Sequence, residues 1–216
     1  MDVQVLIGPE GLDPARRADV DDDTLAALYA PPVRPWWRAS MVATTDGAAS
    51  GPDGLSGSIN DDADGRVFAA MRAAADAVVV GAGTARAEGY GPADVPLVVV
   101  SRRGEVPDGL RDAEPGRVVL ATGDDAEPTR LRAMLTDRGW TSVMVEGGPS
   151  LLGSLLAAGV VDELCLTTVP RLLGGDAGRV VGGEDLDEHL ELTQLLEEDG
   201  TLLARYAVRR DRERRP

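Results

Sequence analysis

Residues 143–159 read VMVEGGPSLLGSLLAAG and pass from an apolar strand through an acid and two glycines into a Leu-rich helix. Pro149 suits the first turn of that helix, and Gly159 suits the position just after its end. A buried strand that leads directly into a helix is the repeating unit of an α/β sheet. In such sheets ligands bind beyond the carboxyl ends of the strands, where the following helices begin. The pair Gly147 and Gly148 is therefore either a tight turn or one wall of an anion-binding site.

The same alternation of strand and helix continues on both sides of this stretch. Further buried strands are expected within 38–46, 77–83, 95–104, 116–123 and 161–175, helices within 62–76 and 128–140, and a final antiparallel pair within 188–210. This order predicts a single α/β domain over residues 1–216, with a mostly parallel central sheet, helices on both faces and an antiparallel C-terminal edge. We expect residues 1–35 to wrap around the domain and residues 209–216 to form a disordered tail. The Gly/Ser/Asp-rich loop 51–65 is too long for a simple connection, which favours a functional role.

The composition excludes several classes of protein. A formal net charge of −15 at pH 7 would repel nucleic acid. The chain has no Lys, which excludes a Schiff-base lysine and the phosphate-binding lysine of a Walker motif. The single Cys165 and the single His189 provide no metal-ligand spacing, so no metal is expected. No segment approaches the roughly 20 apolar residues of a membrane span, and we expect a cytoplasmic protein without a membrane partner.

A second glycine-rich corner lies at residues 78–89, VVVGAGTARAEG. Gly81, Gly83 and Thr84 stand where a strand ends and a helix begins, and glycine allows the backbone to approach an anion closely. The pattern is not the dinucleotide fingerprint G-x-G-x-x-G, because Arg86 occupies the place of the third glycine. An ordinary Rossmann dehydrogenase is therefore disfavoured.

Between the two corners a third strand ends in SRR, residues 101–103. A hydroxyl at Ser101 and a guanidinium at Arg102 could contact the 2′-phosphate of a nucleotide. The alternative is a solvated turn. Together with the two glycine corners, the SRR turn favours NADPH over NADH as a cofactor.

Two acids occupy the strand ends that face the expected cleft. Asp46 follows the strand that begins at Arg38, and Glu146 precedes the glycine pair. They are the candidate catalytic residues, although Asp46 with Gly47 also fits a turn and Glu146 also fits a helix-dipole partner. Nucleophile-elbow serines and Cys/His pairs are absent from the sequence, which excludes hydrolases built on them.

The ordered set of motifs TTDG (44–47), GAGTARAE (81–88), VVVSRR (98–103), VEGGPSLLGSLL (145–156) and VDELCLTTVPRLLGG (161–175) resembles the pyrimidine reductase family of riboflavin biosynthesis. This family has a dihydrofolate-reductase-like fold. The resemblance covers about Trp36 to Gly175 and is nearest to a stand-alone branch that lacks the fused deaminase domain.

The resemblance implies an NADPH-dependent oxidoreductase that converts 5-amino-6-(5-phosphoribosylamino)uracil to its ribitylamino form by hydride transfer to the sugar C1′. It also implies a homodimer and a small phosphorylated pyrimidine substrate. By the family motifs, Ser56, Arg72 and Glu146 fall on substrate positions, with Arg72 a candidate ligand of the phosphate. The cofactor positions, with those derived above, are Val42, Ser58, Gly81, Gly83, Thr84, Glu88, Ser101, Arg102, Gly147, Gly148, Pro149, Ser150 and Leu151, and the glycine segment extends to Ser154.

Three departures from the family pattern affect the substrate half of the site. Ala48 stands where a basic residue is common, Ser58 stands where a Trp is common, and EGYGPADVP (88–96) replaces an Asp-Pro motif followed by an Arg. Loss of a cation and an aromatic ring would weaken recognition of a phosphorylated substrate. Two alternatives therefore stay open: activity on a dihydrofolate or dihydropterin with the same fold and cofactor, and a non-catalytic NADPH-binding protein.

Overall fold

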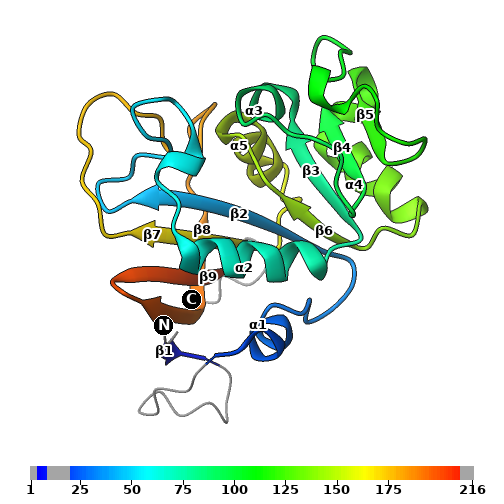
Figure 1. Ribbon diagram of the computed structural model, residues 1–216. Helices are drawn as coiled ribbons and strands as arrows, with labels where there is room; N and C mark the ends of the chain where they lie inside the picture. Colours follow the sequence, from blue (N-terminus) through cyan, green and yellow to red (C-terminus); the bar gives the residue numbers. More distant parts are fainter. Residues whose placement is uncertain (1–3, 9–19, 210–216) are drawn as a thin grey trace.

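The computed structural model describes residues 4–8 and 20–209 (Figure 1). The strands are β1 (Gln4–Ile7), β2 (Trp36–Thr44), β3 (Ala77–Gly81), β4 (Leu97–Val100), β5 (Val118–Ala121), β6 (Ser142–Val145), β7 (Glu163–Val169), β8 (His189–Glu198) and β9 (Thr201–Arg209). The α-helices are α1 (Asp22–Leu28), α2 (Asp62–Ala73), α3 (Ala82–Ala87), α4 (Pro128–Asp137) and α5 (Pro149–Ala157). Short 3₁₀ turns lie at Ser56–Ser58, Asp108–Leu110 and Gly123–Ala126.

All described strands belong to one nine-stranded sheet in the order β1-β8-β9-β7-β2-β6-β3-β4-β5. The six strands from β7 to β5 in this order are parallel to their neighbours. Beyond β7, the strands β9, β8 and β1 are each antiparallel to the preceding one. The predicted mostly parallel sheet with an antiparallel C-terminal edge is confirmed, and β1 extends that edge by one strand.

Helices cover both faces of the sheet, as predicted. One hydrophobic cluster joins α1, α2 and α3 to the sheet through residues such as Leu25, Met71 and Val78. A second cluster packs α4 and α5 on the opposite face, where Val79 points. Adjacent residues of β3 thus enter different clusters, because side chains alternate across a strand. This two-sided burial explains why β3 and β4 read as uninterrupted apolar runs.

Helix α5 begins and ends where its flanking residues predict. Pro149 occupies its first turn, where a missing N–H costs no helical hydrogen bond. Gly159 has a φ of +63°, a left-handed conformation that glycine adopts readily just after a helix. The last two strands are joined at Asp199 and Gly200, both with positive φ, which confirms the predicted hairpin.

The ends of the chain are only partly described. The described part of the N-terminal segment contains β1 and α1, with Val5, Leu25 and Leu28 buried in the core. Of the tail that we expected from residue 209 onward, Arg209 is the last residue of β9, and residues 210–216 lie outside the described part. None of the helices in residues 4–8 and 20–209 combines the length and the apolar character that crossing a bilayer requires.

A buried group of charges joins the start of β2 to the antiparallel edge. The Glu163 carboxylate on β7 accepts hydrogen bonds from Arg38 Nε and, at 2.6 and 2.8 Å, from Arg205 Nη2 and Nε. Arg38 Nη1 donates to the carbonyl of Tyr29 at 2.6 Å, and the Tyr29 ring lies beside both guanidinium groups. The neighbouring Cys165 is buried and packs in the core.

Candidate active site

A cavity of about 690 Å³ opens beside the middle of β2. β2 pairs with β6 only over Trp36–Ala39, whereas its pairing with β7 continues from Arg38 to Thr44. β6 ends at Val145, so from Ser40 onward one edge of β2 has no strand beside it and faces the cavity. The cavity is therefore a crevice at the carboxyl end of a parallel strand, the usual ligand site of open α/β sheets.

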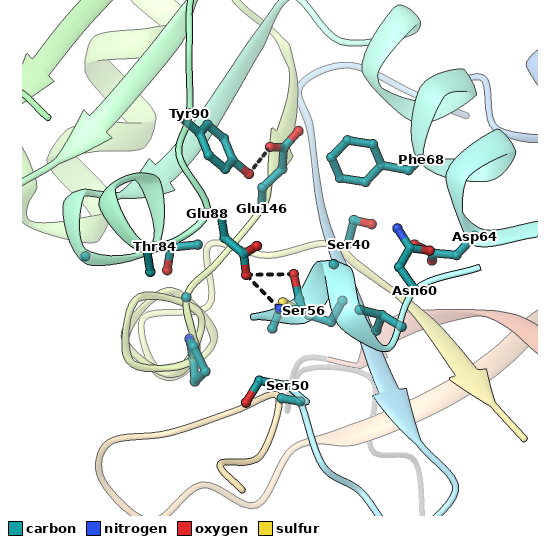
Figure 2. Close-up of a pocket in the computed structure, with 18 of the residues that line it drawn as sticks. Ser40, Ser50, Ser56, Asn60, Asp64, Phe68, Thr84, Glu88, Tyr90 and Glu146 are labelled. Atoms are coloured by element: carbon teal, nitrogen blue, oxygen red, sulfur yellow. Dashed lines mark hydrogen bonds between the residues drawn. The ribbon is translucent and has the colours of Figure 1, made fainter. Parts of the chain in front are cut away.

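Glu146 is the charged group at the end of β6, and its side chain is 1% exposed. Its carboxylate accepts bidentate hydrogen bonds from Arg72 Nε and Nη2, both at 2.9 Å, and a third from the Tyr90 hydroxyl at 2.6 Å. Burial, followed by the negative charge of Glu146, raises the pKa of Tyr90, so the tyrosine stays a donor. Bidentate charge-assisted pairs fix geometry as well as charge. This network therefore presents a rigid polar wall to the cavity (Figure 2).

The Arg72 guanidinium has limited freedom to bind a phosphate. Two of its nitrogens are engaged by Glu146, and the group lies 5.2 Å from the centroid of the Phe68 ring and 5.8 Å from that of Tyr90. A phosphate would have to be reached by the remaining nitrogen, Nη1. The assignment of Arg72 as a phosphate ligand stays a prediction.

A second acid, Asp64, lines the cavity from the first turn of α2 and is 5% exposed. Its Oδ1 accepts a hydrogen bond from the hydroxyl of Thr167 on β7. Burial raises its pKa to about 6, against the lowering effect of the Thr167 hydrogen bond. Figure 2 shows Asp64 and Asn60 projecting toward the cavity from the start of α2, with Ser40 nearby on β2. No motif in the sequence marks Asp64 as a site residue.

The long loop before α2 is attached to α3 through Glu88. Glu88 Oε1 accepts from the Ser56 backbone N–H at 2.8 Å and from the Ser56 hydroxyl at 2.9 Å. Both residues line the cavity, so the loop forms part of its wall. The functional role expected for a connection of this length stays a prediction. Ser58, in contrast, donates to Asp53 Oδ1 at 2.7 Å and is not among the lining residues.

The two glycine corners meet at the cavity. The Gly81 N–H donates to the Gly147 carbonyl at 2.7 Å, and the Gly147–Gly148 peptide bond is cis. A Cβ on Gly148 would lie 2.4 Å from Thr84 Oγ1, which is too close for any side chain. Gly83 also lines the cavity, and a Cβ there would meet nothing within 4 Å. The backbone is thus crowded by Thr84 at Gly148 and open at Gly83.

The contact between Gly148 and Thr84 predicts a steric effect on stability. Gly148→Ala should lower the free energy of unfolding in urea by about 1–3 kcal/mol, because a crowded site must shift to accept the methyl group. Gly148→Ala with Thr84→Ala should recover most of that loss. Gly83→Ala is the matched control and should not destabilise, since space is open there. Equal losses in Gly148→Ala and the double variant would refute the proposed clash.

The structure brings together about half of the predicted site residues. The predicted residues that line the cavity are Val42, Ser56, Arg72, Gly83, Thr84, Glu88, Glu146, Gly148 and Pro149. Gly81 and Gly147 are close to these lining residues in the chain and are joined to each other by a hydrogen bond. Ser150 and Leu151 continue into the first turn of α5, with Ser150 exposed. The predicted roles of these residues stay predictions.

Asp46 does not line the cavity. Its Oδ2 accepts from the backbone N–H groups of Leu173 at 3.0 Å and Gly174 at 2.6 Å, and its Oδ1 accepts from the Thr44 hydroxyl. The Thr44 hydroxyl, followed by the Gly174 amide, holds the pKa of Asp46 below its usual range. These contacts tie the turn after β2 to the loop after β7. They account for Asp46 without a catalytic role, so that role stays a prediction without support from the cavity.

Ser101 and Arg102 lie at the end of β4, on the same edge of the sheet as the glycine corners. The Ser101 hydroxyl is buried and accepts from the Glu105 N–H at 3.2 Å, which stabilises the turn. Arg102 is exposed. Of the two, Arg102 is the one whose side chain is accessible to a ligand that extends along this edge.

The sequence and the fold of the chain are similar to those of known proteins. Residues 35–203 match the family model described as the RibD C-terminal domain. The chain is 32% identical over 152 residues to the riboflavin biosynthesis protein RibD of Mycobacterium tuberculosis, which covers 65% of this chain and 42% of the relative. It is 28% identical over 218 residues to the 2,5-diamino-6-ribosylamino-4(3H)-pyrimidinone 5′-phosphate reductase of Methanothermobacter thermautotrophicus, which covers 82% of this chain and 100% of the relative.

Among solved structures, a pyrimidine reductase-like protein from Corynebacterium diphtheriae matches with a TM-score of 0.69 and 25% identity, covering 82% of this chain and 93% of that one. RibD of Acinetobacter baumannii matches with a TM-score of 0.69 and 21% identity, covering 82% of this chain and 59% of that one. The chain thus spans less than half the length of the mycobacterial RibD and the full length of the archaeal reductase.

Proposed function

The chain belongs to the RibD C-terminal domain family, and on that premise we propose that it is a pyrimidine reductase of riboflavin biosynthesis. Its substrate is 5-amino-6-(5-phosphoribosylamino)uracil, whose ribosyl group it reduces to ribityl with NADPH. The observation that carries the proposal is the crevice beside β2, which is lined by the network around Glu146 and by the adjoining glycine corners. The name of the archaeal relative, a reductase of a phosphorylated ribosylaminopyrimidine, supports this choice.

The glycine corners fit a nicotinamide dinucleotide. The surface over Gly83 is open, so the chain presents backbone there where a ligand could lie against it, whereas the missing side chain of Gly148 leaves room for the protein's own Thr84. Gly83, Thr84, Gly148 and Pro149 would hold the cofactor near the start of α5, whose N-terminal dipole favours phosphate. When bound, NADPH supplies the hydride.

The preference for NADPH over NADH rests on Arg102. Its exposed guanidinium stands at the end of β4, and a charge-assisted hydrogen bond to a phosphate is worth about 1.5–3 kcal/mol. Arg102→Ala should therefore weaken NADPH binding by about 10- to 100-fold and leave NADH binding unchanged, as measured by calorimetric titration. Arg103→Ala is the matched control. An unchanged NADPH/NADH ratio in Arg102→Ala would rule out this placement of the 2′-phosphate.

The substrate half of the cavity is polar but has few cations. Ala48, at a position where the family commonly has a basic residue, is buried, and Gly91, Pro92 and Ala93 line the cavity where an Arg is expected. Glu146 and Ser56 remain to position the pyrimidine and the sugar. This shortage of cations favours a second candidate substrate, a dihydropterin, which has no phosphate.

The assay that tests the proposal follows NADPH oxidation with each substrate. We expect turnover of the phosphoribosylaminouracil, with a product heavier by two hydrogen atoms in mass spectrometry. The 2-amino pyrimidinone analogue should be tested in parallel, because the archaeal relative is named for it. Turnover of dihydrofolate alone would favour the second candidate. Tight NADPH binding without turnover of any substrate would indicate a non-catalytic protein.

We further propose that the protein is a homodimer made of one reductase domain per chain, and that it works in the cytoplasm, where NADPH and phosphorylated intermediates are available. Light scattering coupled to gel filtration tests the dimer directly. A monomer of 22.6 kDa would contradict it.

A further inference from the structure

The proposed reduction needs a proton as well as a hydride, and the inference below rests on that function. When a ribosylamine becomes a ribitylamine, a C–H bond forms at C1′ and the bond between C1′ and the ring oxygen breaks. The electron pair of the broken bond stays on that oxygen, which must gain a proton to become a hydroxyl group. A donor within the cavity, positioned at the sugar, would accelerate this step.

Three carboxyl groups from the described residues line the cavity, and two of them are poorly suited to donate a proton. Both oxygens of Glu146 are already engaged, because they accept two hydrogen bonds from Arg72 and one from Tyr90. Glu88 accepts hydrogen bonds from both the amide and the hydroxyl of Ser56 on one oxygen, which holds it against the loop before α2. Each of these two acids therefore has a structural role, which is to hold neighbouring residues of the cavity wall in place.

Asp64 has a different environment. It is 5% exposed, and the partner of its carboxyl group is a neutral hydroxyl, that of Thr167. The charged group that acts on it from its own helix is Asp61, which makes ionisation harder rather than easier. Asp61 is itself held by the Thr201 hydroxyl from β9 and caps α2 through the N–H of Asp64. From β7, the side chain that meets Asp64 is Thr167, which carries no charge.

We propose that Asp64 is the proton donor of the reduction: its carboxyl group transfers a proton to the sugar ring oxygen as the C1′–O bond breaks and C1′ gains a hydride from a reduced nicotinamide. The resulting Asp64 carboxylate then takes a proton from solvent through the open cavity. Asn60 and Ser40, which line the same part of the cavity, are placed to hold the sugar hydroxyls. The dinucleotide is oxidised by two electrons, so the reaction balances with one proton consumed.

The first test needs neither cofactor nor substrate. Carbon-13 NMR of protein labelled at the Asp carboxyl carbons should show a resonance that titrates near pH 6 and disappears in Asp64→Asn. Thr167→Val should raise the midpoint by about one pH unit, because it removes a hydrogen bond that favours the ionised form. Titration of Asp64 near 4, as in an exposed aspartate, would overturn the proposal.

The second test follows activity against pH. Wild-type kcat/KM should fall about tenfold per pH unit above the Asp64 midpoint, since the donor must be protonated. In Thr167→Val this decrease should begin at a higher pH. Asp64→Asn should lower kcat/KM at pH 6 by about 10²- to 10⁴-fold, abolish the decrease with pH and leave the NADPH dissociation constant unchanged. Asp62→Asn, an exposed neighbour on the same helical turn, is the matched control and should behave as wild type.

The outcomes separate this inference from the proposed function. If the wild type turns over the substrate and kcat/KM of Asp64→Asn decreases with pH as in the wild type, the role of Asp64 is overturned and the proposed reductase function stands. Absence of wild-type turnover with every pyrimidine would overturn both. Loss of the decrease with pH in Asp64→Asn, with cofactor affinity retained, would support both.

Discussion

Glu146→Gln should lower kcat/KM by about 100-fold, which corresponds to about 2.7 kcal/mol of lost transition-state stabilisation. Glutamine keeps the shape of the side chain but removes the charge that binds Arg72 at two points. One of the two carboxylate oxygens is replaced by an NH2 group, which only donates, so glutamine cannot accept all three hydrogen bonds from Arg72 and Tyr90. Arg72, whose side chain is 31% exposed, is then free to leave the wall of the cavity.

Steady-state kinetics and cofactor titration would measure this effect. The NADPH dissociation constant should change less than kcat/KM, because the proposed cofactor contacts are Gly83, Gly148 and Pro149 rather than the side chains of the network. Tyr90→Phe removes one of the three hydrogen bonds and should cost about tenfold or less in kcat/KM. Glu127→Gln, which alters an exposed cap of α4, is the control and should have wild-type kinetics. If Glu146→Gln kept the wild-type value of kcat/KM, the network would have no role in the proposed reaction.

Glu163→Gln should lower the free energy of unfolding by about 3–5 kcal/mol, the usual cost of removing one partner from a buried ion pair. The side chains of Arg38 and Arg205 are 6% and 12% exposed, so their charges would lose their shared partner while still shielded from water. Urea unfolding at pH 7 would measure the loss. Asp108→Asn, which breaks the exposed pair with Arg111, is the matched control and should cost less than about 1 kcal/mol.

The stabilising effect of Glu163 should also depend on pH. Burial opposes ionisation, but the charges of Arg38 and Arg205 outweigh it, so the pKa of Glu163 is lowered from its usual value of 4.5. A lowered pKa means that the stabilisation is fully present above about 4.5 and is lost as the pH falls toward the pKa of the folded state. The difference between wild type and Glu163→Gln should therefore shrink on acidification below that pH. A difference that grows on acidification would contradict this assignment.

The fold could be predicted from the sequence because its signals are local. The run Val78–Val80 is apolar at every position, which fits burial on both faces, and Pro149 and Gly159 mark the two ends of α5. The order of strands in the sheet is not a local property. The insertion of β2 between β6 and β7 became visible only in the structure.

The site could be predicted less completely, for the same reason. Thr84 and Gly148 were identified through motifs at strand ends, and they meet in the cavity. Asp64 was missed because an acid in the first turn of a helix is ordinarily explained by the helix dipole, and its partner Thr167 lies 103 residues away. The contact between Asp46 and the amide of Gly174 could not be predicted either, because the two residues lie 128 positions apart; the catalytic role of Asp46 stays a prediction.

The interruption of pairing along β2 has a consequence for how the protein is made. The crevice exists because β6 pairs with one edge of β2 only as far as Ala39, while β7 pairs with the other edge as far as Thr44. These two strands begin at Ser142 and Glu163, more than 100 residues after the start of β2. The lining residues of the crevice extend to Gly178. Contacts between such distant segments form late and slow the folding of a sheet. A chain emerging from the ribosome can therefore acquire ligand-binding capacity only after most of its length has been synthesised.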